Sequence, residues 1–186
     1  IEAAITTHPY GLGCFEIHSM DTTGNKCIES LARLYNKTNY QFVRPIHEQL
    51  VPYNSKTKTD FFDIPVIVIH EGYNLSKDEM SKKIHRDLDL LLIELHHTED
   101  SYNLYQVGQC YYLLKDWKTA LKYWDKALNY DIDPSQGYVR MLIIGYAYSL
   151  FHLGHTIEAI NFLLPLESEF SNYADYAFLL GFLYFH

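Results

Sequence analysis

The most constraining feature of this sequence is the alternation of small and large side chains within residues 101–134. Gly108 and Ala120 stand twelve positions apart, and each is followed three or four positions later by a large aromatic residue, Tyr111 or Trp124. A small residue lets two helix backbones approach closely, and a large residue beside it fills the space where the helices diverge. The stretch therefore predicts two antiparallel helices that cross closely.

Residues 101–134 resemble a tetratricopeptide repeat (TPR). The break between the helices falls at residues 114–116, where Asp116 is placed to cap the second helix. One hairpin of this kind cannot bury its own apolar face, so more copies are expected. The positions that match the repeat pattern are Leu104, Val107, Gly108, Tyr111, Ala120, Trp124, Ala127 and Pro134.

Further copies follow. Ala147 and Ala159 repeat the twelve-residue spacing, with Ala147 39 residues after Gly108 and Gly181 34 residues after Ala147. We expect repeats at 101–134 and 140–173, and a partial third at 174–186 that Ala177, Leu180, Gly181 and Tyr184 mark. Pro165 should kink or end the helix that contains it. The alternative is an ordinary amphipathic helical bundle.

Composition narrows the class of protein. Hydrophobic residues make up 48% of the 186 residues and charged residues 20%, which is typical of a globular chain. The net charge of −8 and the absence of a Lys/Arg run disfavour binding to nucleic acid. Three scattered cysteines indicate free thiols in a reducing compartment, so we expect a cytoplasmic protein without a transmembrane segment. The first residue is Ile1 and the third repeat is interrupted, so we also expect a fragment of a longer protein.

Residues 1–74 have a different pattern. Residues 14–18 alternate with period two, residues 27–35 do so in part, and residues 42–51 are plausible as an extended segment. Residues 65–70 (PVIVIH) are a β-branched run and the clearest strand. We expect a few strands that belong to a larger α/β unit. Ser76 and Glu79 then form a capping box, which predicts a bridging helix within residues 75–98 before the repeats at 99–186.

Three segments of the first half resemble family 2 glycosyltransferases that carry C-terminal TPRs. Residues 32–36 (ARLYN) with 46–49 (IHEQ) are similar to that family's R-L-F-R-N and I-H-E-Q runs. Residues 69–73 (IHEGY) are similar to its H-x-G-Y, and residues 83–91 (KIHRDLDLL) to its K-x-x-R-N-L-x-L-L. The order and spacing agree. The resemblance implies that the first half is a remnant of a GT-A-type catalytic domain.

The resemblance also implies site residues and a cofactor. In the full-length parent, His47 would be a ligand of a divalent Mg or Mn ion, Glu48 would be the catalytic base, and His70 would line the acceptor cleft. The alternatives are a surface His-Glu pair and an ordinary hydrogen-bonded histidine. The nucleotide-binding half with its Asp-x-Asp motif is absent, so we expect the fragment itself to be inactive and to need no cofactor.

The repeats supply a second candidate site, because the first helix of each pair lines the concave groove in the TPR proteins that the sequence resembles. This face is aromatic and almost uncharged, which favours an apolar or amphipathic protein or peptide partner over a terminal carboxylate. The alternative is packing against the rest of the protein. Its residues are Tyr102, Tyr105, Gln109, Tyr112, Met141, Ile144, Tyr148, Phe151, Phe178, Phe182 and Phe185.

Taken together, the sequence predicts a mainly α fold, a solenoid of TPR-like antiparallel helical hairpins preceded by a small α/β or β-rich remnant. The predicted function is the C-terminal portion of a nucleotide-sugar-dependent glycosyltransferase whose repeats bind an acceptor or partner. The competing hypothesis is a non-enzymatic TPR module for protein–protein interaction.

Overall fold

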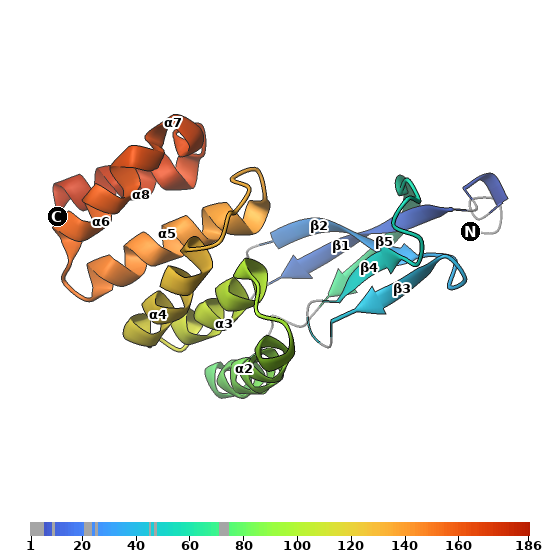
Figure 1. Ribbon diagram of the computed structural model, residues 1–186, viewed down its shortest axis with the longest axis horizontal. Helices are drawn as coiled ribbons and strands as arrows, with labels where there is room; N and C mark the ends of the chain where they lie inside the picture. Colours follow the sequence, from blue (N-terminus) through green and yellow to red (C-terminus); the bar gives the residue numbers. More distant parts are fainter. Residues whose placement is uncertain are drawn as a thin grey trace. The chain divides into compact units, whose positions relative to one another are not determined.

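A computed structural model describes residues 6–8, 10–20, 24, 26–44, 46, 48–70 and 75–186 of the chain (Figure 1). The chain forms two compact units, Ile1–Lys82 and Lys83–His186. The described strands lie in the first unit and the helices from α2 onward lie almost wholly in the second. Each unit is described by itself below.

The first unit is built on a three-stranded sheet in the order β2-β1-β5. Strand β1 (Gly11–Met20) pairs antiparallel with β2 (Lys26–Leu34) and parallel with β5 (Asp60–His70). The period-two alternation and the β-branched run thus mark real strands. The buried side chains of this sheet are Leu12, Cys14, Ile17, Ser19 and Ile64.

A short hairpin completes the first unit. Strands β3 (Tyr40–Val43) and β4 (Gln49–Pro52) pair antiparallel as a separate two-stranded sheet. Tyr40 is 1% exposed, and its hydroxyl donates to the Tyr10 carbonyl at 2.7 Å. This bond ties the hairpin to the residue just before β1.

Helix α2 (Lys77–His97) starts at the predicted capping box. The Ser76 N–H donates to Glu79 Oε2 at 2.9 Å, and the Glu79 N–H donates to Ser76 Oγ at 3.3 Å. Hydrogen bonds from Ser76 lower the pKa of the Glu79 carboxyl. Its buried residues are Ile84, Leu88 and Leu91, which lie on one side of the helix.

The second unit continues with paired helices. Helix α3 (Ser101–Leu113) is followed by α4 (Trp117–Leu128), and α5 (Gly137–His152) by α6 (Thr156–Leu163). Asp116 caps α4 by accepting from the Thr119 N–H at 3.1 Å, as predicted. The helix break at residues 114–116 falls where it was predicted, and further breaks lie near residues 132–137 and 153–155.

Trp124 is the centre of this unit's packing. The indole of Trp124 is fully buried, and its Nε1–H donates to the Tyr105 carbonyl at 3.0 Å. A Cβ added at Gly108 would overlap its five-membered ring, and one added at Gly145 would lie 2.6 Å from its Cη2 atom. The indole therefore fills the space left by two glycines, one on α3 and one on α5. The predicted close crossing at Gly108 is confirmed.

The turn after α3 is built like the turn after α5. Lys115 has a left-handed φ of 63°, and Gly154 has a φ of 82°. In both turns the residue with positive φ donates its N–H three residues back, and the next residue donates five residues back, to Tyr111 and Leu150 respectively. The two turns are 39 residues apart, the same offset as between Gly108 and Ala147.

The last part of the chain departs from this regularity. Pro165 ends α6 as predicted, and a short 3₁₀ turn (Leu164–Leu166) leads into α7 (Glu167–Phe170) and α8 (Ala174–Phe185). A Cβ added at Gly181 of α8 would meet nothing within 4 Å. The described residues therefore form no close helix crossing at Gly181.

The predicted fold class, a mainly α solenoid of TPR-like hairpins with a small remnant, is wrong. The chain is 54% helical with 22% strand in two small sheets, which is a mixed α/β fold and not a clear solenoid of helical hairpins. The strands before α2 explain the error, because they pair along most of their lengths and form more than the small remnant that was expected.

We predict opposite effects of the same substitution at two helical glycines. Replacing Gly by Ala in a helix interior normally stabilises by about 0.5–1 kcal/mol. Gly181→Ala should show this gain, whereas Gly108→Ala should destabilise by about 1–3 kcal/mol, because the new methyl group overlaps the buried Trp124 indole. Urea unfolding of both variants measures the difference. Equal stability changes would rule out a close crossing at Gly108.

Candidate functional site

The site residues implied by the glycosyltransferase resemblance are not gathered on one element. Glu48 is exposed and directly precedes β4, and His47 lies outside the described residues. His70 ends β5 on the other sheet, where its exposed ring has Nδ1 3.2 Å from Ser19 Oγ. Among the described residues, no group of three or more His, Cys, Asp or Glu side chains is arranged to hold a metal ion. The described part of the chain therefore does not by itself fit the divalent ion that the resemblance implies.

The three-stranded sheet carries a cavity of about 500 Å³. Its lining includes the side chains of Cys14, Glu16, Glu29 and Asp63. Three carboxylates around one cavity repel an anionic ligand unless a cation accompanies it. This cavity is therefore a poor match for a sugar-nucleotide diphosphate bound by these residues alone.

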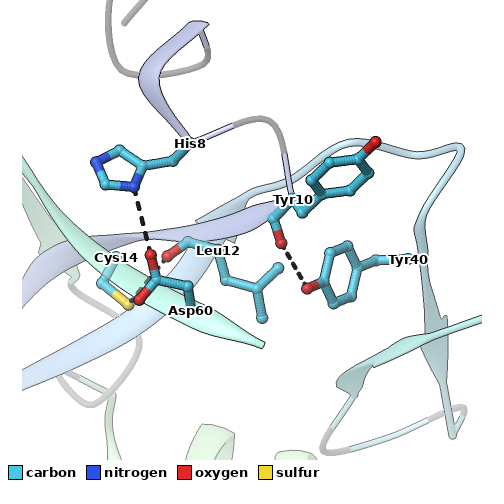
Figure 2. A network of polar contacts seen from close by, with 6 residues as sticks. All are labelled: His8, Tyr10, Leu12, Cys14, Tyr40 and Asp60. Atoms are coloured by element: carbon cyan, nitrogen blue, oxygen red, sulfur yellow. Dashed lines mark hydrogen bonds and ion pairs between the residues drawn. The ribbon is translucent and has the colours of Figure 1, made fainter. Parts of the chain in front are cut away.

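A second, smaller cavity lies beside a His–Asp pair that the sequence did not point to (Figure 2). His8 Nδ1 is 3.4 Å from Asp60 Oδ2, and the His8 ring stacks on Phe62 with centroids 4.4 Å apart. The cavity has a volume of about 340 Å³, and Asn36 and Lys37 also line it. The carboxylate orients the imidazole, and the described lining offers only the Tyr35 phenol as a hydroxyl, so we assign the cavity no reaction.

His8 and Asp60 are 52 positions apart in the sequence and meet because β1 and β5 are parallel and in register. Gly11 at the start of β1 is paired with Asp60 at the start of β5. Neither residue belongs to a local motif, so only the strand pairing reveals that they are neighbours.

The helical unit brings aromatic side chains from three helices onto one face. We call this set, Tyr112, Tyr148, Phe151, Phe178 and Phe182, the aromatic face. Phe182 of α8 is central: its ring centroid lies 5.0 Å from Phe151, 6.5 Å from Tyr148 and 6.2 Å from Phe178. Tyr112 of α3 is linked to α5 through Trp117, whose ring lies 5.0 Å from Tyr112 and 4.3 Å from His152.

Histidine and tryptophan side chains border the aromatic face. His152 stacks on Trp117 with centroids 4.3 Å apart, and His186 lies 4.5 Å from Phe182. No member of the face carries a charge, and Phe178 is 65% exposed. The face therefore presents aromatic area to solvent with an imidazole at its edge.

Several other residues that the sequence predicted for the concave groove are not available to a partner. Tyr105 is 7% exposed and Ile144 is 9% exposed, so both belong to the core. Tyr102 packs against Tyr138, with centroids 5.2 Å apart, in a separate cluster. Met141 is exposed, and Gln109 is half-buried. The helical periodicity did not reveal how deeply each side chain is buried.

The chain matches no protein-family model, and none of the curated proteins matches it either. None of the helices in the described ranges is both long enough and apolar enough to cross a bilayer.

We predict that stability falls at alkaline pH, in part through Tyr105. Burial, followed by the nearby Tyr102, raises the pKa of Tyr105 to about 12, whereas an unfolded tyrosine titrates near pH 10. The folded state thus keeps a proton that the unfolded state releases, so this contribution is present below pH about 10 and is lost as the pH rises toward 12. The loss amounts to about 2–3 kcal/mol.

Urea unfolding at pH 9 and pH 11 measures this effect. Tyr105→Phe should reduce the difference in unfolding free energy between the two pH values. Tyr184→Phe is the control, because Tyr184 is 61% exposed. An unchanged pH dependence in Tyr105→Phe would show that Tyr105 ionises as easily in the folded chain as in the unfolded one.

Proposed function

We propose that the helical unit binds an apolar protein segment along the aromatic face. We further propose that the chain is the C-terminal portion of a nucleotide-sugar-dependent glycosyltransferase, in which this unit recruits the protein acceptor or a partner. The observation that carries the first proposal is the convergence of Tyr148, Phe151, Phe178 and Phe182 on one uncharged face, to which Tyr112 is joined through Trp117 and His152.

Aromatic side chains are suited to this role. Each supplies a large contact area with only two rotatable side-chain bonds, so little conformational entropy is lost on binding. Tyr112 and Tyr148 also carry hydroxyls that can bond to a peptide backbone at the edge of the contact. An apolar helix with anchors at positions i, i+3 and i+7 matches a face of this kind.

The glycosyltransferase part rests on the ordered resemblance of residues 32–36, 46–49, 69–73 and 83–91 to that family. In that proposal Glu48 accepts the proton of the acceptor hydroxyl, and its exposed position leaves it accessible to an acceptor. The competing hypothesis is a non-enzymatic interaction module, in which only the binding by the helical unit is retained. Cys27 is exposed and unpaired, and Cys14 and Cys110 are buried free thiols, which supports a cytoplasmic location.

Binding is tested with a fluorescent helical peptide that carries Leu and Phe on one side and Gln on the other. The chain should bind it, and Phe178→Ser should weaken binding by about tenfold, as is usual for an aromatic residue at the centre of an interface. Ile157→Ser on α6 is the matched control, because Ile157 is also highly exposed, at 76%. Fluorescence anisotropy gives both dissociation constants. An equal loss in the two variants would show that the peptide binds any exposed apolar residue.

Catalysis is tested in the longer protein that contains this chain. Glu48→Gln keeps the shape of the side chain but removes the base, so it should lower transfer of sugar to acceptor by about 10²–10⁴-fold with little change in donor binding. Glu169→Gln, which alters an exposed carboxylate on α7, is the control. Full activity of Glu48→Gln would leave Glu48 as an ordinary surface group and favour the interaction module.

A further inference from the structure

A stripe of lysines lies on the exposed side of α4. Lys118, Lys122 and Lys126 recur every four residues along the helix, and Lys115 precedes them in the turn. We call these four residues the lysine stripe, and all of them are exposed. A step of four residues rotates by only about 40° and rises about 6 Å, so the helical lysines form one nearly straight row.

The stripe is set opposite the packed side of α4. Ala120, Trp124 and Ala127 are the buried residues of this helix. Asp125, at the margin of the stripe, accepts from the Tyr146 hydroxyl at 2.6 Å and is thereby held toward α5. The row of ammonium groups is therefore presented to solvent by a helix whose other side is fixed in the core.

The charges of the stripe are not neutralised within the chain. The helical unit, Lys83–His186, has seven Lys and Arg residues against thirteen Asp and Glu, and four of the seven are in the stripe. Within the described part of the chain, none of the four forms an ion pair. Arg86 instead pairs with Asp87 at 2.7 Å, and Arg140 approaches Asp175 at 3.7 Å and lies over the Tyr173 ring. Unpaired positive charge is thus concentrated on one row of an acidic unit.

We propose that the lysine stripe is a docking surface for an acidic helix of a partner protein. A helix with Glu or Asp at every fourth position has the same rise of about 6 Å between charges, so the two rows can align along their whole length. Each pair is weak because it is exposed, but three or four pairs formed together give measurable affinity and set the orientation of the partner.

An acidic protein segment fits the surface better than a nucleic acid or an anionic membrane. The chain carries a net charge of −8, so an extended polyanion that reaches beyond the stripe meets repulsion. The stripe contains no arginine for bidentate phosphate contacts, and the exposed residues of α4 include no aromatic or aliphatic side chain to stack on bases or enter a lipid layer.

The probe for this proposal is a fluorescein-labelled, alanine-rich helical peptide with Glu at every fourth position. Fluorescence anisotropy at about 50 mM salt should show binding to the whole chain, and the affinity should fall as salt is raised. The triple variant K118E/K122E/K126E should bind at least about tenfold more weakly. The matched control is K37E/K56E/K58E, which makes the same change in charge on exposed lysines of the first unit and should bind within about twofold of the wild type.

Three further measurements complete the test. Circular dichroism shows whether charge reversal disturbs folding. If it does, the peptide-binding measurement is repeated with the neutral variant K118Q/K122Q/K126Q. A peptide of the same composition with its Glu residues dispersed around the helix should bind more weakly than the aligned one. A single-stranded oligonucleotide and phosphatidylserine vesicles should not bind through the stripe.

The proposal is overturned by no binding of the aligned peptide, by equal losses in the stripe and control variants, or by equal binding of the two peptides. Tighter binding of the oligonucleotide or the vesicles than of the peptide, abolished by the stripe variant, would assign the surface to a polyanion instead.

Discussion

The helical unit depends on how one indole ring is held. Trp124 is buried between Gly108 and Gly145, and its only polar atom is bonded to the Tyr105 carbonyl. The absence of side chains on the two glycines lets α3 and α5 approach α4 at that level, while the hydrogen bond prevents the ring from turning away. Because α3 and α5 are fixed relative to one another in this way, Tyr112 of α3 and His152 of α5 both pack on Trp117. The same contact fixes α4 with its lysines facing outward.

Features that depend on nearby residues could be predicted from the sequence. The capping box at Ser76, the cap at Asp116, the helix breaks and the close crossing at Gly108 follow from spacing and local chemistry. The pairing of β1 with β5 could not be predicted, because it depends on contacts between residues about fifty positions apart. The His8–Asp60 pair was missed for that reason, and the extent of strand pairing made the expected mainly α fold wrong.

The burial of the predicted binding residues also depends on parts of the chain that are distant in sequence. Helical periodicity predicted Tyr105 and Ile144 for the concave face, but both are buried because neighbouring helices cover them. Gly145 was not singled out, since its importance comes from a tryptophan 21 positions earlier in the chain. The lysine stripe is visible in the sequence as a four-residue period, but its lack of ion pairs is visible only in the structure.

The two interhelical turns differ in the steric cost of their left-handed residue. Gly154 adopts this conformation at no steric cost, whereas a residue with a Cβ, such as Lys115, is strained there by about 1–2 kcal/mol. The two turns share the same hydrogen bonds, so the α3–α4 turn is the less stable of the pair. The packing of α3 and α4 around the buried Trp124 holds this strained turn in place. The end of the lysine stripe is therefore also a strained point of the backbone.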